Sequence, residues 1–78
     1  MEFLIGVNDG EFLFDNATQD TWRTDAMYTA LDVAGNLAAR PYEFGYKAEE
    51  IDKLDIEKRD ENGETVWVRT VYTREDEE

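Results

Sequence analysis

Two glycine-containing turn signals divide this chain, and they restrict its fold more than any other feature. The first is Asn-Asp-Gly at residues 8–10, and the second is Asp-Glu-Asn-Gly at residues 60–63. Glycine adopts the positive φ that tight turns require, so each signal predicts a β-hairpin. The strands of these two hairpins are expected within residues 2–7, 11–14, 51–59 and 64–73.

In the first hairpin, the turn position decides which side chains face the core. A turn centred on Asp9-Gly10 pairs Val7 with Phe12 and leaves Leu4 and Leu13 on the opposite face. The first strand is then apolar on both faces, as is typical of a central strand. The side chains expected on the core face are Phe3, Ile5, Val7, Phe12 and Phe14.

The second hairpin admits two registers. A two-residue turn containing Gly63 pairs Ile56 with Arg69 and leaves charged side chains on both faces. A type I turn with Gly63 as a bulge residue pairs Ile56 with Val68 and separates charged from apolar side chains. We therefore prefer the bulged turn, which places these side chains on the core face: Leu54, Ile56, Val66, Val68 and Tyr72.

Residues 17–39 place apolar side chains at the three- and four-residue spacing of an amphipathic helix. Asn16 and Gln19 resemble a capping box at its start, and Pro41 ends it. The apolar stripe consists of Trp22, Ala26, Ala30, Val33, Ala34, Leu37 and Ala38. Residues 41–50 follow as a connection whose aromatic side chains either cover the core or stand exposed.

The order of these elements predicts an α+β fold of the ββαββ type, with one helix packed on a four-stranded, mostly antiparallel sheet. The charged third strand suits an edge, and the fourth, rich in Val, Trp and Tyr, suits the centre beside a parallel first strand. This arrangement is similar to the β-grasp roll of immunoglobulin-binding bacterial domains. We expect a single domain over 1–73 and a solvated acidic tail over 74–78. The residues predicted to be buried together are Phe3, Ile5, Phe12, Phe14, Trp22, Ala30, Leu37, Ile56, Val68 and Tyr72.

Charge indicates the class of partner. Twenty acidic and eight basic residues give a net charge of −12. Such a surface repels nucleic acid and anionic lipid and attracts basic protein. The sequence therefore predicts a basic protein or nucleoprotein partner, with no direct binding of nucleic acid or membrane. With no cysteine, no apolar run of about 20 residues and no basic amino-terminal segment, a cytoplasmic location is expected. An alternative is that the acidity serves only solubility or life at high salt.

The inventory of reactive side chains argues against catalysis. The chain has no histidine and no cysteine, which removes the commonest general base and the strongest nucleophile. Carboxylates near Asp55 and near Glu61 could bind Ca²⁺ weakly, but the EF-hand spacing is absent. We therefore expect no enzyme activity, cofactor, metal site or small-molecule substrate.

The expected binding surface is the outer face of the second hairpin. On the bulged register, Trp67 and Val71 lie there beside Asp55 and Glu57, and an aromatic ringed by charge is typical of a binding hot spot. The alternative is that Trp67 packs under the connection of residues 41–50 or against Leu4 and Leu13. Further acidic candidates for partner contact are Asp25 and Asp32 on the solvent side of the predicted helix, and Glu49 and Glu50.

In type, the chain resembles the small phage-encoded inhibitors of bacterial defence, namely anti-CRISPR proteins and antirestriction DNA mimics. The resemblance is carried by small size, the helix over 17–39, the hairpin from Ile51 to Val68, and the acidic runs at 49–50 and 75–78. It implies a protein that occupies a nucleic-acid-binding surface, with carboxylates in place of phosphates. Two alternatives are a salt-adapted acidic domain and an immunity or antitoxin protein that neutralises a basic toxin.

Overall fold

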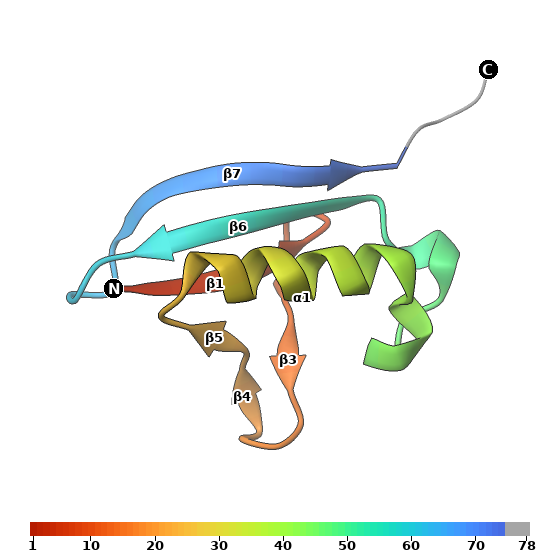
Figure 1. Cartoon of the computed structure of the whole chain (residues 1–78), viewed down its shortest axis with the longest axis horizontal. Coiled ribbons are helices and arrows are strands. Elements are labelled where there is room, and N and C mark those ends of the chain that lie inside the picture. Colours follow the sequence, from red (N-terminus) through yellow and green to blue (C-terminus); the bar gives the residue numbers. More distant parts are fainter. Residues whose placement is uncertain (75–78) are drawn as a thin grey trace.

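The computed structural model describes residues 1–74, so the predicted tail at 74–78 lies outside the described residues except for Arg74. Within these residues, one α-helix, two short 3-10 helices and seven strands follow one another (Figure 1). They are β1 (Glu2–Val7), β2 (Glu11–Phe12), β3 (Phe14–Asp15), β4 (Asp20–Thr21), β5 (Arg23–Thr24), α1 (Met27–Ala39), η1 (Pro41–Phe44), η2 (Ala48–Glu50), β6 (Lys53–Arg59) and β7 (Thr65–Thr73).

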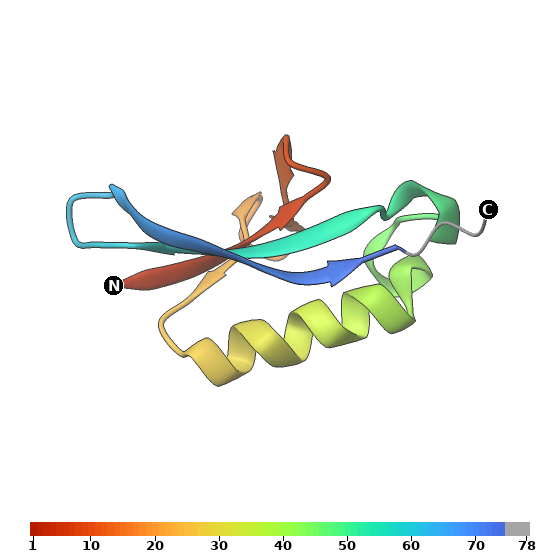
Figure 2. The ribbon, with the colours of Figure 1, turned by 90° about the horizontal axis from the view of Figure 1, so that it is seen from above.

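The main sheet has the strand order β2-β1-β6-β7, with β5 also paired to β1, and every described pair is antiparallel. The helix α1 lies across one face of this sheet (Figure 2). The predicted α+β fold, one helix on a mostly antiparallel sheet, is confirmed.

The predicted strand order within that sheet is wrong. Strand β6, rather than β7, lies beside β1, and β7 forms the edge, so the parallel pair of a β-grasp roll does not form. The many charges of β6 suggested an edge strand. However, its Leu54 and Ile56 are both 0% exposed and face the helix, while its acidic side chains turn to the other face. Because apolar and charged side chains alternate along β6, one of its faces is apolar, and the strand suits the centre of the sheet.

The segment predicted as the first half of the helix forms strands instead. Strands β2 and β5 follow one another along the same edge of β1, and residues 14–21 leave the sheet between them as the β3–β4 hairpin (Figure 1). At the branch point, the Leu13 N–H donates to the Ile5 carbonyl and the Trp22 N–H to the Leu13 carbonyl, both at 2.8 Å.

Side-chain hydrogen bonds explain why the expected capping box is a turn. The Asp15 carboxylate accepts the Ala17 N–H at 3.0 Å, and Gln19 adopts a positive φ of 59°. Asp and Asn side chains compete with helical hydrogen bonds in this way. The helix therefore begins at Met27, and among residues 1–74 no helix is long and apolar enough to cross a membrane.

The first hairpin is shifted by one residue from its predicted register. Val7 pairs with Glu11, because Asn8 and Asp9 take the positive φ values (58° and 68°) of the turn. The Asn8 carboxamide oxygen accepts the backbone N–H groups of Asp52 and Lys53 at 2.7 and 3.1 Å. This contact joins the turn to a distant part of the chain, which local sequence does not reveal.

A one-residue shift moves every side chain to the other face of the sheet. Leu13 is therefore buried at 3% exposure, while Phe12 and Phe14, both predicted to be in the core, are exposed at 36% and 51%.

The second hairpin has the predicted turn but not the predicted register. Gly63 has a φ of 84°, and its N–H donates to the Asp60 carbonyl at 3.0 Å, as expected for a bulge residue after a type I turn. Two further register shifts then occur, near Val66 and Val71. As a result Ile56 pairs with Arg69, and Val68, predicted to be buried, is 55% exposed.

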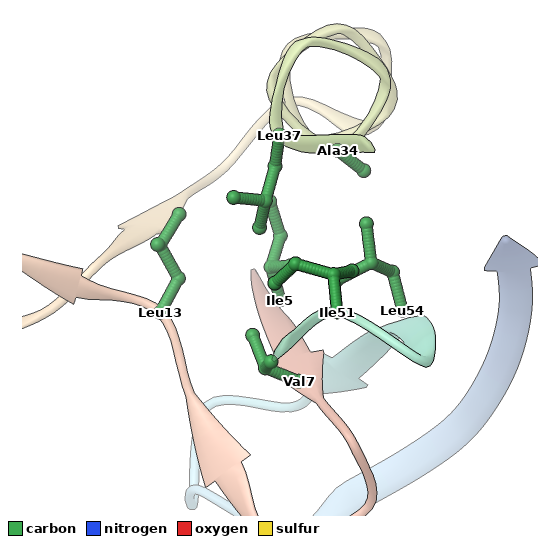
Figure 3. Close-up of a cluster of buried hydrophobic side chains, with 7 residues drawn as sticks. All are labelled: Ile5, Val7, Leu13, Ala34, Leu37, Ile51 and Leu54. Carbon is green, nitrogen blue, oxygen red and sulfur yellow. The ribbon is translucent and has the colours of Figure 1, made fainter. Parts of the chain in front are cut away.

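The core consists of two adjoining clusters between α1 and the sheet. The larger one, drawn in Figure 3, contains Ile5, Val7, Leu13, Ala34, Leu37, Ile51 and Leu54. The smaller one contains Phe3, Ala30 and Ile56, with Trp22, Met27, Trp67 and Val71 packed against it.

Of the predicted core, Phe3, Ile5, Ala30, Leu37 and Ile56 are buried, and Trp22 and Tyr72 are half-buried. In the connection, Phe44 and Tyr46 pack on the larger cluster, whereas Tyr42 is 71% exposed.

Tyr46 makes stability sensitive to alkaline pH. Burial raises the pKa of its phenol above the ordinary 10.0, and the carboxylates of Glu11 and Glu50 raise it further. Because the raised pKa belongs to the folded state, this contribution to stability is complete below about pH 10 and is lost as the pH rises through the folded pKa.

We expect Tyr46→Phe to reduce the loss of unfolding free energy between about pH 9 and pH 11, measured by urea denaturation. Equal losses in Tyr46→Phe and the wild type would contradict this assignment.

Candidate functional site

Asp55 is the one buried charged residue within residues 1–74, at 7% exposure. It lies on the face of the sheet opposite α1, which we call the outer face, and its Oδ1 accepts a hydrogen bond from the Thr70 hydroxyl at 2.8 Å. Its cross-strand neighbour on β1 is Gly6. A Cβ atom at Gly6 would lie 3.7 Å from the Asp55 Cβ, so the absence of a side chain there leaves the carboxylate region open.

Asp55 contributes to the lining of a shallow, open depression of about 250 Å³, which we call the Asp55 depression. Four carboxylates line it, together with the exposed apolar side chains of Phe12 and Val68, and no basic side chain is among its described lining residues. This combination suits a cation carried on an apolar stem, as in arginine or lysine. The lining residues are Gly6, Asp9, Gly10, Glu11, Phe12, Asp55, Glu57 and Val68.

The outer face already holds one guanidinium group in this manner. The Arg59 Nε lies 2.6 Å from the Glu57 Oε2, and the Arg59 Cζ lies 5.2 Å from the centroid of the Phe12 ring. The Thr65 hydroxyl donates to the same Glu57 oxygen at 2.8 Å. Glu57 is therefore largely satisfied within the chain, and it shapes the wall of the depression more than it offers free charge.

Asp9 is also paired at the rim, where the Lys53 Nζ lies 2.9 Å from its Oδ1. This hydrogen bond raises the pKa of the Lys53 amine and outweighs the opposing effect of burial, and the charges of Asp55 and Asp9 raise the pKa further. Glu11 and Asp55 have no ion-pair partner among the described residues. These two carboxylates are consequently the ones most available to an incoming cation.

The structure brings only part of the predicted site together. Asp55 and Glu57 share the outer face, as expected. Trp67 and Val71 do not, because the register shifts turn them toward the helix, where they pack on the smaller core cluster. The Trp67 ring lies 6.1 Å from that of Phe3, so the prediction of an outer-face Trp67 is wrong, and Trp67 packs on Phe3 and its neighbours rather than on Leu4, Leu13 or the 41–50 connection.

The other predicted acidic residues lie elsewhere. Asp25 and Asp32 are exposed, the first before α1 and the second on it, and α1 covers the opposite face of the sheet (Figure 2). Glu49 and Glu50 are exposed in η2, where the Glu50 carboxylate accepts the Lys47 N–H at 2.7 Å. None of these four lines the Asp55 depression.

Sequence reasoning missed Gly6, Asp9, Glu11 and Phe12 as site residues. An isolated glycine within a strand signals close approach of neighbouring groups, and Gly6 in the apolar run of residues 2–7 carried that signal. Asp9 was assigned to the turn and Glu11 to the second strand, neither with a binding role, and Phe12 was assigned to the core because the first hairpin was placed one residue out of register.

Within residues 1–74, no group of three or more potential ligands is arranged to hold a metal ion. The four carboxylates of the depression present a negative surface. None of the protein-family models, curated proteins or solved structures compared with this chain matches it.

Proposed function

We propose that the protein is a non-enzymatic inhibitor that binds a basic, nucleic-acid-binding surface of a bacterial defence complex, in the manner of an anti-CRISPR protein or DNA mimic. The observation that carries the proposal is the buried Asp55 carboxylate in a depression lined by three further carboxylates. A buried carboxylate is costly unless a positive charge compensates it, and here the compensating group would come from the partner.

The depression suits an arginine side chain of that partner. The guanidinium would pair with Asp55 and Glu11, and its methylene stem would lie against the exposed side chains of Phe12 and Val68. Arginine residues that bind phosphates in nucleic acid bind carboxylates with similar geometry. The proposal places this interaction in the cytoplasm, where defence complexes meet nucleic acid.

Association should be steered by charge, because the chain carries a net charge of −12. Raising the salt concentration from about 50 to about 500 mM shortens the screening length from roughly 14 to roughly 4 Å. We therefore expect a marked fall in the association rate, measured by stopped-flow or surface plasmon resonance. A rate that does not change with salt would indicate a purely apolar interface.

The partner can be sought by capture from a bacterial lysate on immobilised protein, followed by elution with duplex DNA. Two variants of equal net charge make the experiment specific to the site. Asp9→Asn/Glu11→Gln removes two charges from the Asp55 depression, and Asp25→Asn/Asp32→Asn removes two from the helix side.

We expect a protein that binds the wild type and the helix-side variant, is lost with the depression variant, and is displaced by DNA. Equal capture by both variants would contradict the assigned site. A captured protein that DNA does not displace would contradict the proposed inhibition of nucleic-acid binding.

A further inference from the structure

Within residues 1–74, strand β7 has an unpaired edge along its whole length. It pairs with β6 alone and ends the sheet, and its nine residues include only one charged side chain, Arg69. Six of the nine are β-branched, and Val66 and Val68 are 49% and 55% exposed. A long edge of this kind is a template for another strand, and natural proteins ordinarily protect such edges with charged side chains, proline or a covering element.

The hydrogen bonds of β1 show how the backbone of β6 is oriented. In an antiparallel pair, a residue directs both backbone groups toward the same neighbour, and successive residues alternate. The Asn8 N–H donates to the Lys53 carbonyl at 2.9 Å, and the β1–β6 register continues from this pair without a break. The backbone groups of Asp55 and Glu57 therefore also point toward β1 and away from β7.

The orientation of β7 follows from that of β6. The β7 residues opposite Asp55 and Glu57 use no backbone groups for β6, so their groups point outward. At one end of β7 the Glu64 carbonyl accepts the Asp60 N–H at 2.9 Å, and at the other end the Arg74 N–H donates to the Asp52 carbonyl at 2.8 Å. Glu64 and Arg74 therefore direct their backbone groups toward the preceding strand, and the residues next to them, Thr65 and Thr73, direct theirs outward. The four residues whose backbone N–H and C=O groups point away from β6, toward the free edge, are Thr65, Val68, Thr70 and Thr73.

The spacing of these four residues is the same when read from either end, with Arg69 at the centre. The two register shifts leave Val66 and Val71 without a partner on β6, so two consecutive residues, 66–67 and 71–72, separate the outward-pointing residues on either side. These two pairs lie symmetrically about Arg69. A two-fold axis through Arg69 would therefore place Val68 opposite Thr70 of a second copy, with outward backbone groups facing each other. It would also place Thr65 opposite Thr73, so that residues 66–67 of one copy lie opposite residues 71–72 of the other.

We propose that two copies of this chain pair through β7 in an antiparallel, two-fold arrangement that joins their sheets. The pairing places Glu64 of one copy opposite Arg74 of the other at both ends. Its costs are the apposition of the two Arg69 side chains and the mutual repulsion of two chains of charge −12. Because Val68 also lines the Asp55 depression, the dimer would bring two depressions onto one continuous face.

Salt distinguishes this pairing from binding to a basic partner. Screening weakens repulsion between like-charged chains, so the dimer should tighten between about 50 and about 500 mM NaCl, whereas a complex with a basic protein should loosen. The proposal does not depend on the proposed function, and the two respond to salt in opposite directions. Sedimentation equilibrium on the full chain, up to about 0.5 mM, measures the dimer directly.

Variants of β7 test the geometry. Val68→Pro removes an N–H that β6 does not use, so it should abolish the dimer, while Val68→Thr retains that N–H and should preserve it. Arg69→Thr removes the like-charged pair and should tighten the dimer about 2- to 5-fold. Circular dichroism checks that each variant folds.

A chain that stays monomeric at both salt concentrations, in the wild type and Arg69→Thr alike, overturns the proposal. A dimer that folded Val68→Pro leaves intact also overturns it, since the contact then lies elsewhere. If Val68→Pro does not fold, the salt response and Arg69→Thr decide the question.

Discussion

Leu37→Ala is expected to lower the free energy of unfolding by about 3–5 kcal/mol, a large part of the stability of so small a domain. Leu37 is 0% exposed and packs among Ile5, Ala34 and Leu54 in the larger cluster (Figure 3). Its removal leaves a cavity between the helix and the sheet that neither can close without moving. Urea denaturation followed by circular dichroism measures the loss.

Phe14→Ala is the matched control for this substitution. Phe14 is 51% exposed on the β3–β4 hairpin, so its truncation should cost less than about 1 kcal/mol, although the sequence alone placed it in the core. If Phe14→Ala proved the more destabilising change, the register of the first hairpin described above would be wrong.

Trp67→Ala is expected to cost about 3 kcal/mol, at the lower end for a tryptophan because the side chain is half-buried. It removes the ring packed on Phe3 and Ile56. It also removes one of the two aromatic partners of the Lys58 amine, which lies 6.0 Å from the Trp67 ring centroid and 5.9 Å from that of Phe3. Trp67→Phe retains an aromatic ring and should lose less. Thermal unfolding and urea denaturation followed by circular dichroism provide the comparison.

Trp67→Ala also tests whether Trp67 belongs to the core or to the binding surface. Binding of a basic ligand to the outer face should be unchanged in folded Trp67→Ala, because Trp67 lies on the helix-covered face. Loss of binding without loss of stability would instead show that Trp67 contacts the ligand, and would contradict its position in the core.

Local patterns in the sequence predicted the two hairpins and the second half of the helix, but not strands β3 to β5 or the way the elements pair with one another. The turn at Gly63 and the helix stripe through Ala30, Ala34 and Leu37 depend on local chemistry, and both are present. The register of the first hairpin depends on the Asn8 side chain, which is bound to backbone groups more than forty residues away. No pattern within the hairpin encodes that contact.

The candidate site was predicted only in part, because the faces on which its residues lie depend on the registers of the two hairpins. Asp55 and Glu57 were placed on the outer face because alternation along one strand is a local property. Trp67 was misplaced because an additional bulge near Val66 reverses the faces of the strand, and strand bulges carry little sequence signal outside glycine. The β3–β4 hairpin was missed because Asn16 and Gln19 suit a tight turn as well as a helix cap.

The central claim is that the Asp55 depression binds a basic side chain of a partner. Titration of isotopically labelled protein with a hexa-arginine peptide, followed by amide chemical shifts, tests it most directly. We expect the largest shifts at Gly6, Gly10, Glu57 and Val68, and about tenfold weaker binding in Asp55→Asn, which retains the side-chain shape but loses the charge. Shifts centred instead on the helix side near Asp25 and Asp32, or equal affinity in Asp55→Asn, would contradict it.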